Sequence, residues 1–351
     1  MSESGFFSAA WHRLNPTTTE PTSRPLFEND PLENDALEHN TAAASGEGDD
    51  QTTPQSTLRG GLTQWTLRGT DLGEDVALCE QAGLASIGLS LTKVDEFGRA
   101  RAIERMRDSS LVVSSLDWVC NFNGYAGYSW DEQFDEALRT IRLAGRLGAR
   151  TVTVVTGPSG SHTPTHRLRN VAEALAQLAP VAADCDVDLA VMPMTPACRD
   201  DWTFLHTIPE TVALLERVDH PNVGLLFHAW HLLQQPGSPS YIEQAASWVK
   251  LVRLSDWDPS CRDENDQRFP GEGCLPLRGL VNTLHRHGFA GYYEVDVWSP
   301  QTWGRERPGM VADARRFLGS HRSLPPCSRR ATSSSSPGRP HPQTVLHSVG
   351  R

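Results

Sequence analysis

Short β-rich apolar runs alternate with longer stretches of helical period from about residue 57 onward, and this alternation restricts the fold more than any other feature of the chain. Eight such units occur, with predicted strands over residues 61–67, 86–91, 111–119, 151–156, 188–194, 223–230, 251–256 and 292–298. Strands that alternate with helices predict a parallel sheet. Eight units in roughly 260 residues are typical of a closed barrel. We therefore expect an α/β fold, a (β/α)₈ TIM barrel, over residues 57–322.

The stretches between the predicted strands carry helix signals. In the segment WDEQFDEALRTIRLAGRLGA, Phe134, Leu138 and Ile141 recur at helical spacing and Gly148 follows near the end. Asp71 is a suitable N-cap for the helix predicted before the second strand. No GxGxxG follows the first predicted strand, which lowers the expectation of a dinucleotide-binding fold.

The two ends of the chain have a different composition from the predicted barrel. Residues 1–56 are polar and acidic, and residues 323–351 are basic and rich in Ser and Pro, so we expect disordered tails that bury too little apolar surface to fold. The first 56 residues hold ten acids and two arginines, which is most of the formal net charge of −11. Nucleic-acid binding needs a concentrated basic surface, so we expect no nucleic-acid partner.

Cysteines and apolar runs indicate the cellular environment. The chain has 7 Cys without CxxC spacing, which argues against a disulfide scaffold or a zinc ribbon. We expect no signal peptide, and no apolar run reaches the roughly 18 residues that a membrane span needs. We expect a cytoplasmic protein that does not bind membranes. Whether the protein forms a homo-oligomer remains open.

Chemistry in a TIM barrel lies at the C-terminal ends of the strands, which meet at one mouth. Here the last four predicted strands end in VMPMTP, FHAWH, VRLSDW and EVDVW. These endings supply histidine, arginine, aspartate and tryptophan side chains, so they are the first place to look for a site.

The order of these motifs resembles that of the xylose isomerase-like family of sugar isomerases and epimerases. The family has a Glu-Pro pair on strand five, DxxH on strand six, HxxD on strand seven, an RxPGxG-like loop and an acid on strand eight. The matching segments here are Met192-Pro193-Met194, His228-Ala229-Trp230-His231, Arg253-Leu254-Ser255-Asp256, Arg268-Phe269-Pro270-Gly271-Glu272-Gly273 and Val295-Asp296-Val297. The match covers nearly the whole predicted barrel.

The resemblance implies a divalent metal held at four positions, which fall here on Met192, His228, Arg253 and Asp296. Only Asp296 keeps an acidic oxygen. Hard divalent ions prefer oxygen ligands to a thioether, and a guanidinium stays protonated beside the ion. A divalent metal cofactor is therefore disfavoured. A second arrangement, with zinc-like ligands from His228, His231, Asp256 and Asp296, stays open.

The activity that the resemblance implies is proton transfer next to a carbonyl of a small sugar or polyol, within carbohydrate metabolism. With its ligands replaced, the chain is expected to be an isomerase or epimerase with an altered metal site, and whether it is an active enzyme stays open. The alternative is a metal-free, catalytically degenerate barrel that acts as a ligand-binding or regulatory protein. The zinc-dependent nuclease branch of the fold needs many more His, Asp and Glu ligands than these strand ends carry.

Candidate site residues follow from the strand ends and the resemblance. Arg253 can donate two hydrogen bonds to a carboxylate, phosphate or enediolate, although a structural ion pair with Asp256 is equally open. Glu294 precedes Asp296 by two and is expected on the same side of its strand. The predicted catalytic residues are His231, Asp296 and Asp256, and the predicted substrate-binding residues are Arg253, Arg268, His228, Trp230, Trp298 and Glu272.

Overall fold

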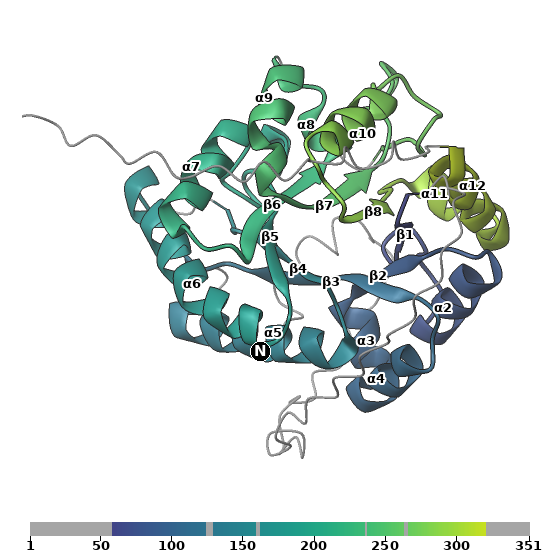
Figure 1. Ribbon diagram of the computed structural model, residues 1–351, viewed down its shortest axis with the longest axis horizontal. Helices are drawn as coiled ribbons and strands as arrows, with labels where there is room; N and C mark the ends of the chain where they lie inside the picture. The colour runs from purple at the N-terminus through teal and green to yellow at the C-terminus, as the bar shows by residue number, and fades with distance from the viewer. Residues whose placement is uncertain (1–57, 124–128, 159–161, 236, 263–265, 321–351) are drawn as a thin grey trace, which may run out of the picture.

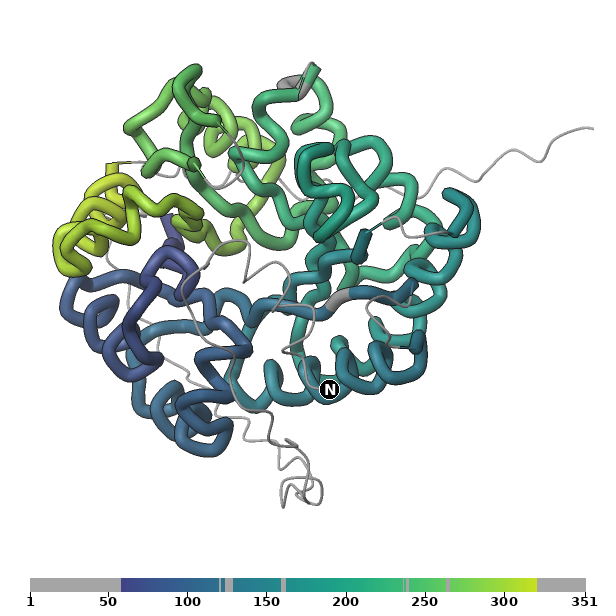
Figure 2. The backbone as a smooth tube through the Cα atoms, turned by 180° about the vertical axis from the view of Figure 1, so that it is seen from behind, coloured from purple at the N-terminus to yellow at the C-terminus, as the bar shows by residue number. Residues whose placement is uncertain are grey.

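A closed parallel barrel organises the protein. The computed structural model describes residues 58–320 except 124–128, 159–161, 236 and 263–265. Within these residues eight strands follow one another around the barrel in sequence order, and helices surround them (Figures 1 and 2). The predicted TIM barrel is confirmed. The tails predicted to be disordered, residues 1–56 and 323–351, lie outside the described residues.

The strands are short and every neighbouring pair is parallel. Closure is made by β1 and β8, where Leu62 is in register with Val295. The strands are β1 Gly60–Thr63, β2 Ser86–Ser90, β3 Val112–Cys120, β4 Thr151–Val155, β5 Asp188–Val191, β6 Val223–His228, β7 Val249–Leu254 and β8 Tyr292–Val295.

Several strands end earlier than the sequence predicts. The expected strand 188–194 ends at Val191, and 292–298 ends at Val295. In both places the chain continues past the last ladder pairing into the mouth of the barrel. The residues beyond the strand, Met192 and Asp296 among them, therefore line the site instead of extending the sheet.

The helices form the outer layer of the barrel (Figure 1). The helix α5 begins with a capping box between Ser129 and Glu132 and ends at Gly148 in the left-handed conformation, so both of its termini are encoded locally. The helices are α2 Leu72–Gln81, α3 Leu91–Phe97, α4 Arg99–Arg107, α5 Trp130–Leu147, α6 Pro164–Asp184, α7 Ile208–Val218, α8 Ala229–Leu232, α9 Ser238–Ala245, α10 Leu277–Arg286, α11 Pro300–Trp303 and α12 Arg307–Ser320.

The barrel interior has an apolar side and a charged side. Strands β4 to β7 contribute Val155, Ala190, Leu226 and Leu251 to an apolar cluster that reaches up to the mouth. Strands β1, β3 and β8 contribute buried polar and acidic side chains, which are Thr63, Ser115, Asp117 and Glu294. The buried polar side chains near the C-terminal ends of the strands thus set the position of the site.

One glycine makes room for these polar side chains. A Cβ atom added at Gly88 on β2 would lie 2.6 Å from Oε1 of Glu294 and 2.9 Å from Oγ of Ser115. Both distances are shorter than a real Cβ tolerates. The absent side chain at position 88 therefore allows the Glu294 carboxylate to lie inside the barrel.

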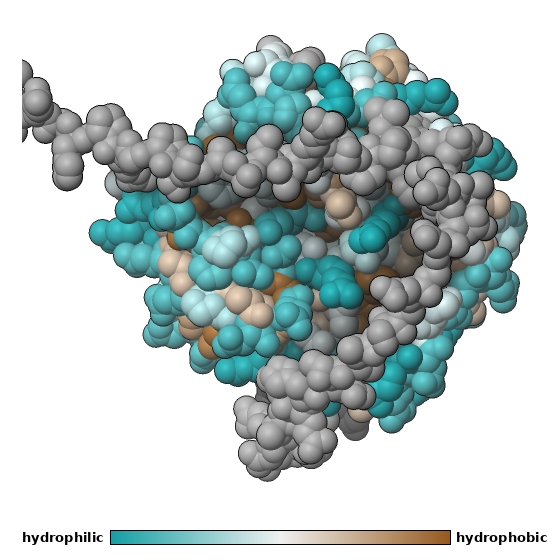
Figure 3. All heavy atoms as spheres, viewed as in Figure 1, coloured by the Kyte–Doolittle hydropathy of each residue, from teal (hydrophilic) through white to brown (hydrophobic). Residues whose placement is uncertain are grey.

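The outer surface is mostly polar. Figure 3 shows hydrophilic side chains over much of the described surface on the face in view. Among the described residues, no helix is both long and apolar enough to cross a bilayer.

Candidate active site at the barrel mouth

A small cavity lies at the C-terminal ends of the strands. Its volume is about 50 Å³, and its polar lining includes His228, His231, Arg253, Gln267 and Asp296. The four positions that carry the metal in the family, Met192, His228, Arg253 and Asp296, all line this one cavity. The positional correspondence to the family motifs therefore agrees with the geometry.

Arg253 is the centre of the site. It leaves β7 near its C-terminal end, is 1% exposed, and is surrounded by the carboxylates of Asp117, Glu294 and Asp296. Its Nη2 donates to both oxygens of Asp117 at 2.6 and 2.7 Å, and its Nε donates to Glu294 at 3.0 Å. Burial alone would lower the pKa of Arg253, but the three carboxylates raise it above its ordinary value. The guanidinium is therefore a fixed positive charge.

One nitrogen of this guanidinium, Nη1, has weaker contacts than the other two. Nη1 of Arg253 has Sδ of Met192 at 4.0 Å and Oδ2 of Asp296 at 3.6 Å, both weaker than its other contacts. Because Met192 and Asp296 line the cavity with Arg253, this nitrogen is the one that lies nearest to a cavity-bound molecule. Nη1 is therefore the guanidinium nitrogen with the weakest contacts.

The carboxylates beside Arg253 are held by hydroxyl groups as well. Oε1 of Glu294 accepts from Ser114 and Ser115, both at 2.7 Å, and Asp117 accepts from the indole of Trp65 at 3.0 Å. Burial raises the pKa of both Glu294 and Asp117, while Arg253 opposes the rise. One arginine faces three acids, so this cluster holds a proton more readily than isolated carboxyl groups do.

Asp296 and His228 form a hydrogen-bonded pair at the edge of the cluster. Oδ2 of Asp296 lies 3.3 Å from Nε2 of His228, and Oδ1 accepts from Thr63 at 2.6 Å. Burial alone would raise the pKa of Asp296, but Arg253, His228 and Thr63 together lower it to about 2. Burial lowers the pKa of His228, so its ring is neutral near pH 7. Since Nε2 donates to the carboxylate, Nδ1 carries the lone pair, and it has no partner among the described residues.

His231 lies beside His228, with the two ring centroids 4.5 Å apart. Its Nδ1 accepts from the backbone N–H of Thr195 at 3.4 Å, which leaves the proton on Nε2. Burial and the neighbouring His228 lower the pKa of His231 well below its ordinary value. His231 is therefore a neutral hydrogen-bond donor in this arrangement.

Tryptophan side chains cover the polar centre. Trp65 stacks between Trp118 and Trp298, at centroid distances of 5.0 and 5.3 Å, and Trp202 meets both outer rings edge-on. Such faces suit the C–H groups of a sugar or polyol. The tryptophans also account for the small volume of the cavity, because three of them line it.

Five of the nine residues predicted from the sequence line this cavity, namely His228, His231, Arg253, Asp296 and Trp298. The cavity lining does not include Trp230, Asp256, Arg268 or Glu272. Arg268 is paired with Asp258 and Asp266 in its own loop, and Glu272 pairs with Arg305 at the surface. Both side chains therefore form ion pairs with neighbouring residues outside the cavity.

Asp256 also serves its own loop. Its carboxylate accepts from the backbone N–H groups of Trp257, Gly271 and Leu275 at 2.9, 3.0 and 2.9 Å. A Cβ at Gly273 would lie 2.4 Å from the same carboxylate, so the loop is wrapped closely around it. The zinc-like arrangement of His228, His231, Asp256 and Asp296 is therefore not formed, and no structural pair joins Asp256 to Arg253.

We expect Asp256→Asn to lower the free energy of unfolding by about 1–3 kcal/mol, since an amide presents an N–H group to one of the three backbone donors. Urea denaturation measures the loss. Asp258→Asn, which changes a partly exposed carboxylate of the same loop, is the matched control and should cost less. Unchanged stability combined with lost activity would instead support the catalytic role predicted from the sequence.

Asp117, Trp202 and Gln267 are site residues that the sequence motifs did not indicate. Asp117 carried a usable signal, because it is the one charged residue in an otherwise apolar and small-residue strand and lies near the strand's end. Trp202 and Gln267 lie in loops between elements. Their position depends on loop conformation, which no periodicity reveals.

The residues present do not fit the family's divalent metal. Among the residues that the structure describes, no three His, Cys, Asp or Glu side chains are arranged to hold a metal ion. The acidic groups converge on the guanidinium of Arg253 and not on an open point. An ion placed among them would meet a positive charge that stays protonated.

A TIM barrel with buried charge at its mouth defines a broad class of small-molecule enzymes and binding proteins. The chain matches the xylose isomerase-like TIM barrel family over residues 76–321, and it belongs to that family. It is 21% identical to the inosose isomerase of Bacillus velezensis, over 67% of this chain and 86% of that protein.

Two solved structures share the fold. The IOLI protein, solved with a bound zinc atom, is 17% identical, with a TM-score of 0.67 over 76% of this chain and 99% of that one. An L-ribulose 3-epimerase is 18% identical, with a TM-score of 0.62 over 74% of this chain and 93% of that one.

Proposed function

We propose that the protein is a metal-independent isomerase or epimerase of a small sugar or polyol, in which the guanidinium of Arg253 takes the place of the divalent cation. The observation that carries this proposal is the position of Arg253, whose charge is buried among three carboxylates at a family metal position. The similarity to an inosose isomerase and to an L-ribulose 3-epimerase supports a substrate of this class.

Arg253 supplies the electrostatic part of the reaction. A carbonyl oxygen of the substrate accepts a hydrogen bond from Nη1, the corner of the guanidinium without a strong partner. Removal of a proton from the adjacent carbon places negative charge on that oxygen, as an enediolate. A fixed cation in a water-poor site stabilises this charge more than it stabilises the neutral carbonyl.

His228 supplies the proton acceptor. Its Nδ1 is buried, neutral and without a partner in the described part of the chain, while Asp296 holds Nε2. Nδ1 takes the proton from the carbon next to the carbonyl, and the resulting imidazolium is stabilised by the Asp296 carboxylate. Return of that proton to the neighbouring carbon, with transfer of the hydroxyl proton to the former carbonyl oxygen, completes an isomerisation. An epimerisation requires a second proton donor on the opposite face of the enediolate, and the proton on His228 is then lost to solvent.

Substrate entry requires movement of the tryptophans. A cavity of about 50 Å³ is far below the roughly 300–1,000 Å³ typical of ligand sites. Trp202 is the side chain best placed to move, because it lies in the loop after β5 and is only partly buried. Binding is then expected to change the intrinsic tryptophan fluorescence.

A second function, ligand binding without turnover, is favoured by one observation. The strand-five position where the family has a glutamate is Met192, and the three carboxylates near the cavity are all engaged by Arg253. If His228 does not act as a base, the same site binds a sugar or polyol and leaves it unchanged. The barrel would then serve as a ligand-binding or regulatory protein.

The test is proton exchange in D₂O with chelator-treated protein, using an inosose and a panel of ketopentoses and ketohexoses. We expect loss of the C–H signal next to the carbonyl, seen by NMR, to persist in EDTA. His228→Gln should slow this exchange by about 10²–10⁴-fold and retain the fluorescence change on binding. Fluorescence change without exchange would establish the binding function. Exchange that is abolished by EDTA and restored by Mn²⁺ would refute the metal-independent reaction.

A further inference from the structure

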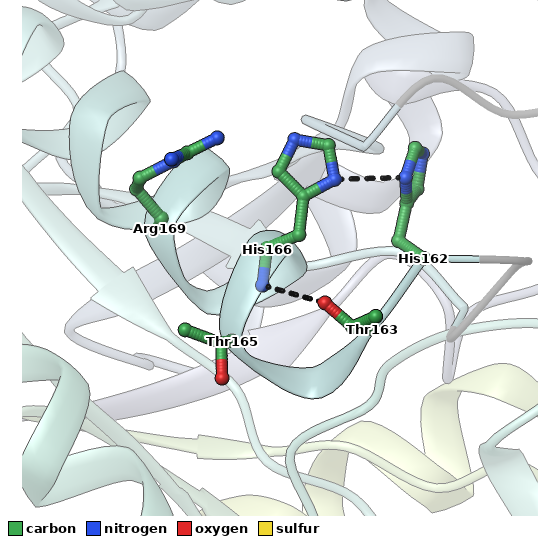
Figure 4. A pocket seen from close by; sticks show the side chains of 5 residues that line it. All are labelled: His162, Thr163, Thr165, His166 and Arg169. Atoms are coloured by element: carbon green, nitrogen blue, oxygen red, sulfur yellow. Dashed lines mark hydrogen bonds between the residues drawn. The ribbon is translucent and has the colours of Figure 1, made fainter.

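A pair of histidines lies outside the barrel cavity, at the start of α6. His162 and His166 line an open hollow of about 470 Å³ together with Arg169 and two threonines (Figure 4). Their Nδ1 atoms are 3.0 Å apart. Neither residue has a part in the chemistry proposed for the barrel mouth, so the pair needs its own explanation.

The hydrogen bonds fix which nitrogen of His162 is available. Nε2 of His162 lies 2.9 Å from the backbone carbonyl oxygen of Asn123, and a carbonyl oxygen only accepts. The proton is therefore on Nε2, and Nδ1 carries a lone pair directed at His166. A backbone carbonyl that holds the far nitrogen is the arrangement by which proteins orient metal-binding histidines.

The fold also fixes the partner ring. Thr163 caps α6 and accepts from the backbone N–H of His166 at 3.3 Å, so the helix begins between the two histidines and holds them side by side. The rings meet edge to face, at a centroid distance of 4.8 Å. Figure 4 shows the two rings turned toward one another above the first helical turn.

We propose that His162 and His166 form a two-histidine site for a transition-metal ion that prefers imidazole nitrogen, Zn²⁺ in the first place. Two tetrahedral Zn–N bonds of about 2.05 Å place their nitrogens about 3.3 Å apart, close to the 3.0 Å found here. A turn of each ring by roughly 35° directs both lone pairs at one ion in this geometry. When the metal binds, the proton on Nδ1 of His166 moves to Nε2 of the same ring, so both histidines stay neutral and no proton is released.

The surroundings define the kind of ion. Among the described residues no third His, Cys, Asp or Glu joins the pair, so water completes the coordination sphere. Hard ions such as Mg²⁺ and Ca²⁺ need oxygen ligands and are excluded by this donor set. Arg169, on the next turn, carries a positive charge that repels a bound cation. Glu173, whose Oε1 lies 4.0 Å from Nε of Arg169, offsets this charge only in part.

The experiment is calorimetric titration of the full chain with Zn²⁺, before and after His166→Ala. The loss of a second-sphere partner alone weakens metal sites by about 10–100-fold, so removal of a ligand should weaken this one by at least about 100-fold. His287→Ala, which removes an exposed histidine bonded to the carbonyl of Thr283, should change nothing. With Cu²⁺ as the probe, electron paramagnetic resonance should show two coupled nitrogens in the native chain and fewer in the variant.

Arg169→Gln separates the metal site from an anion site in the same hollow. The loss of a positive charge should tighten Zn²⁺ binding, whereas it would weaken binding of inorganic phosphate. An isotherm for Zn²⁺ that is the same in the native chain and in His166→Ala would overturn the proposal. Phosphate binding that depends on Arg169, without Zn²⁺ binding at the histidines, would overturn it as well.

Discussion

Arg253→Met is expected to lower the free energy of unfolding by about 3–5 kcal/mol at neutral pH, the usual cost of leaving buried charges without their partner. The substitution keeps much of the side-chain volume but removes the cation that Asp117, Glu294 and Asp296 share. Chemical denaturation measures the loss. Arg139→Ala, which breaks an exposed ion pair with Glu136, is the matched surface control and should cost less than about 1 kcal/mol.

The loss should also depend on pH. Without Arg253 the folded-state pKa values of Asp117 and Glu294 rise further above their unfolded values, and the pKa of Asp296, which Arg253 helps to lower, rises as well. A group with a raised folded pKa favours the folded state below the unfolded pKa and disfavours it as pH rises through the folded pKa. The difference from the native chain should therefore be small near pH 4 and grow toward pH 8.

A combined variant keeps this prediction testable even if Arg253→Met does not fold at neutral pH. Addition of Asp117→Asn and Glu294→Gln removes two of the three uncompensated carboxylates and should restore most of the stability, because neutral replacements of a buried ion cluster are often tolerated. If the single substitution costs no more than the Arg139 control, Arg253 does not neutralise the cluster.

The sequence predicts the barrel and about half of the residues that line the candidate cavity. Hydrophobic periodicity identifies strands and helices because every strand of a parallel barrel is buried on both faces. Strand-end residues such as His228 and Arg253 follow from the topology, since all the strand ends meet at one mouth. Asp296 was found in the same way.

The loops limited what could be predicted. The sequence predicts Asp256 as catalytic because it follows a strand. In the structure its loop folds back over it, and both of its oxygens accept backbone hydrogen bonds. Arg268 likewise forms ion pairs with Asp258 and Asp266 of its own loop. Which charges pair depends on long-range geometry. The pairing of Arg253 with Asp117, 136 residues earlier, has no local signature.

The double substitution Met192→Glu with Arg253→His is expected to create a divalent-metal site where the native residues exclude one. Sδ of Met192 lies 4.0 Å from Nη1 of Arg253, so a carboxylate at position 192 faces the space that the guanidinium leaves. The imidazole introduced at position 253, the carboxylates of Glu294 and Asp296, and that new carboxylate then supply oxygen and nitrogen ligands. Mn²⁺ is the appropriate probe, because the oxygen-rich site suits it and the histidine pair at α6 does not.

The single variants decide the cause of the gain. Mn²⁺ at about 100 times its dissociation constant should stabilise the double variant by about 2.7 kcal/mol, which thermal denaturation with and without Mn²⁺ detects. Met192→Glu alone should gain nothing, because Arg253 remains and pairs with the added acid. If Met192→Glu alone binds Mn²⁺, the guanidinium does not exclude the metal. If the double variant binds none, positions 192, 253 and 296 do not correspond to metal ligands of the family, although all three line one cavity.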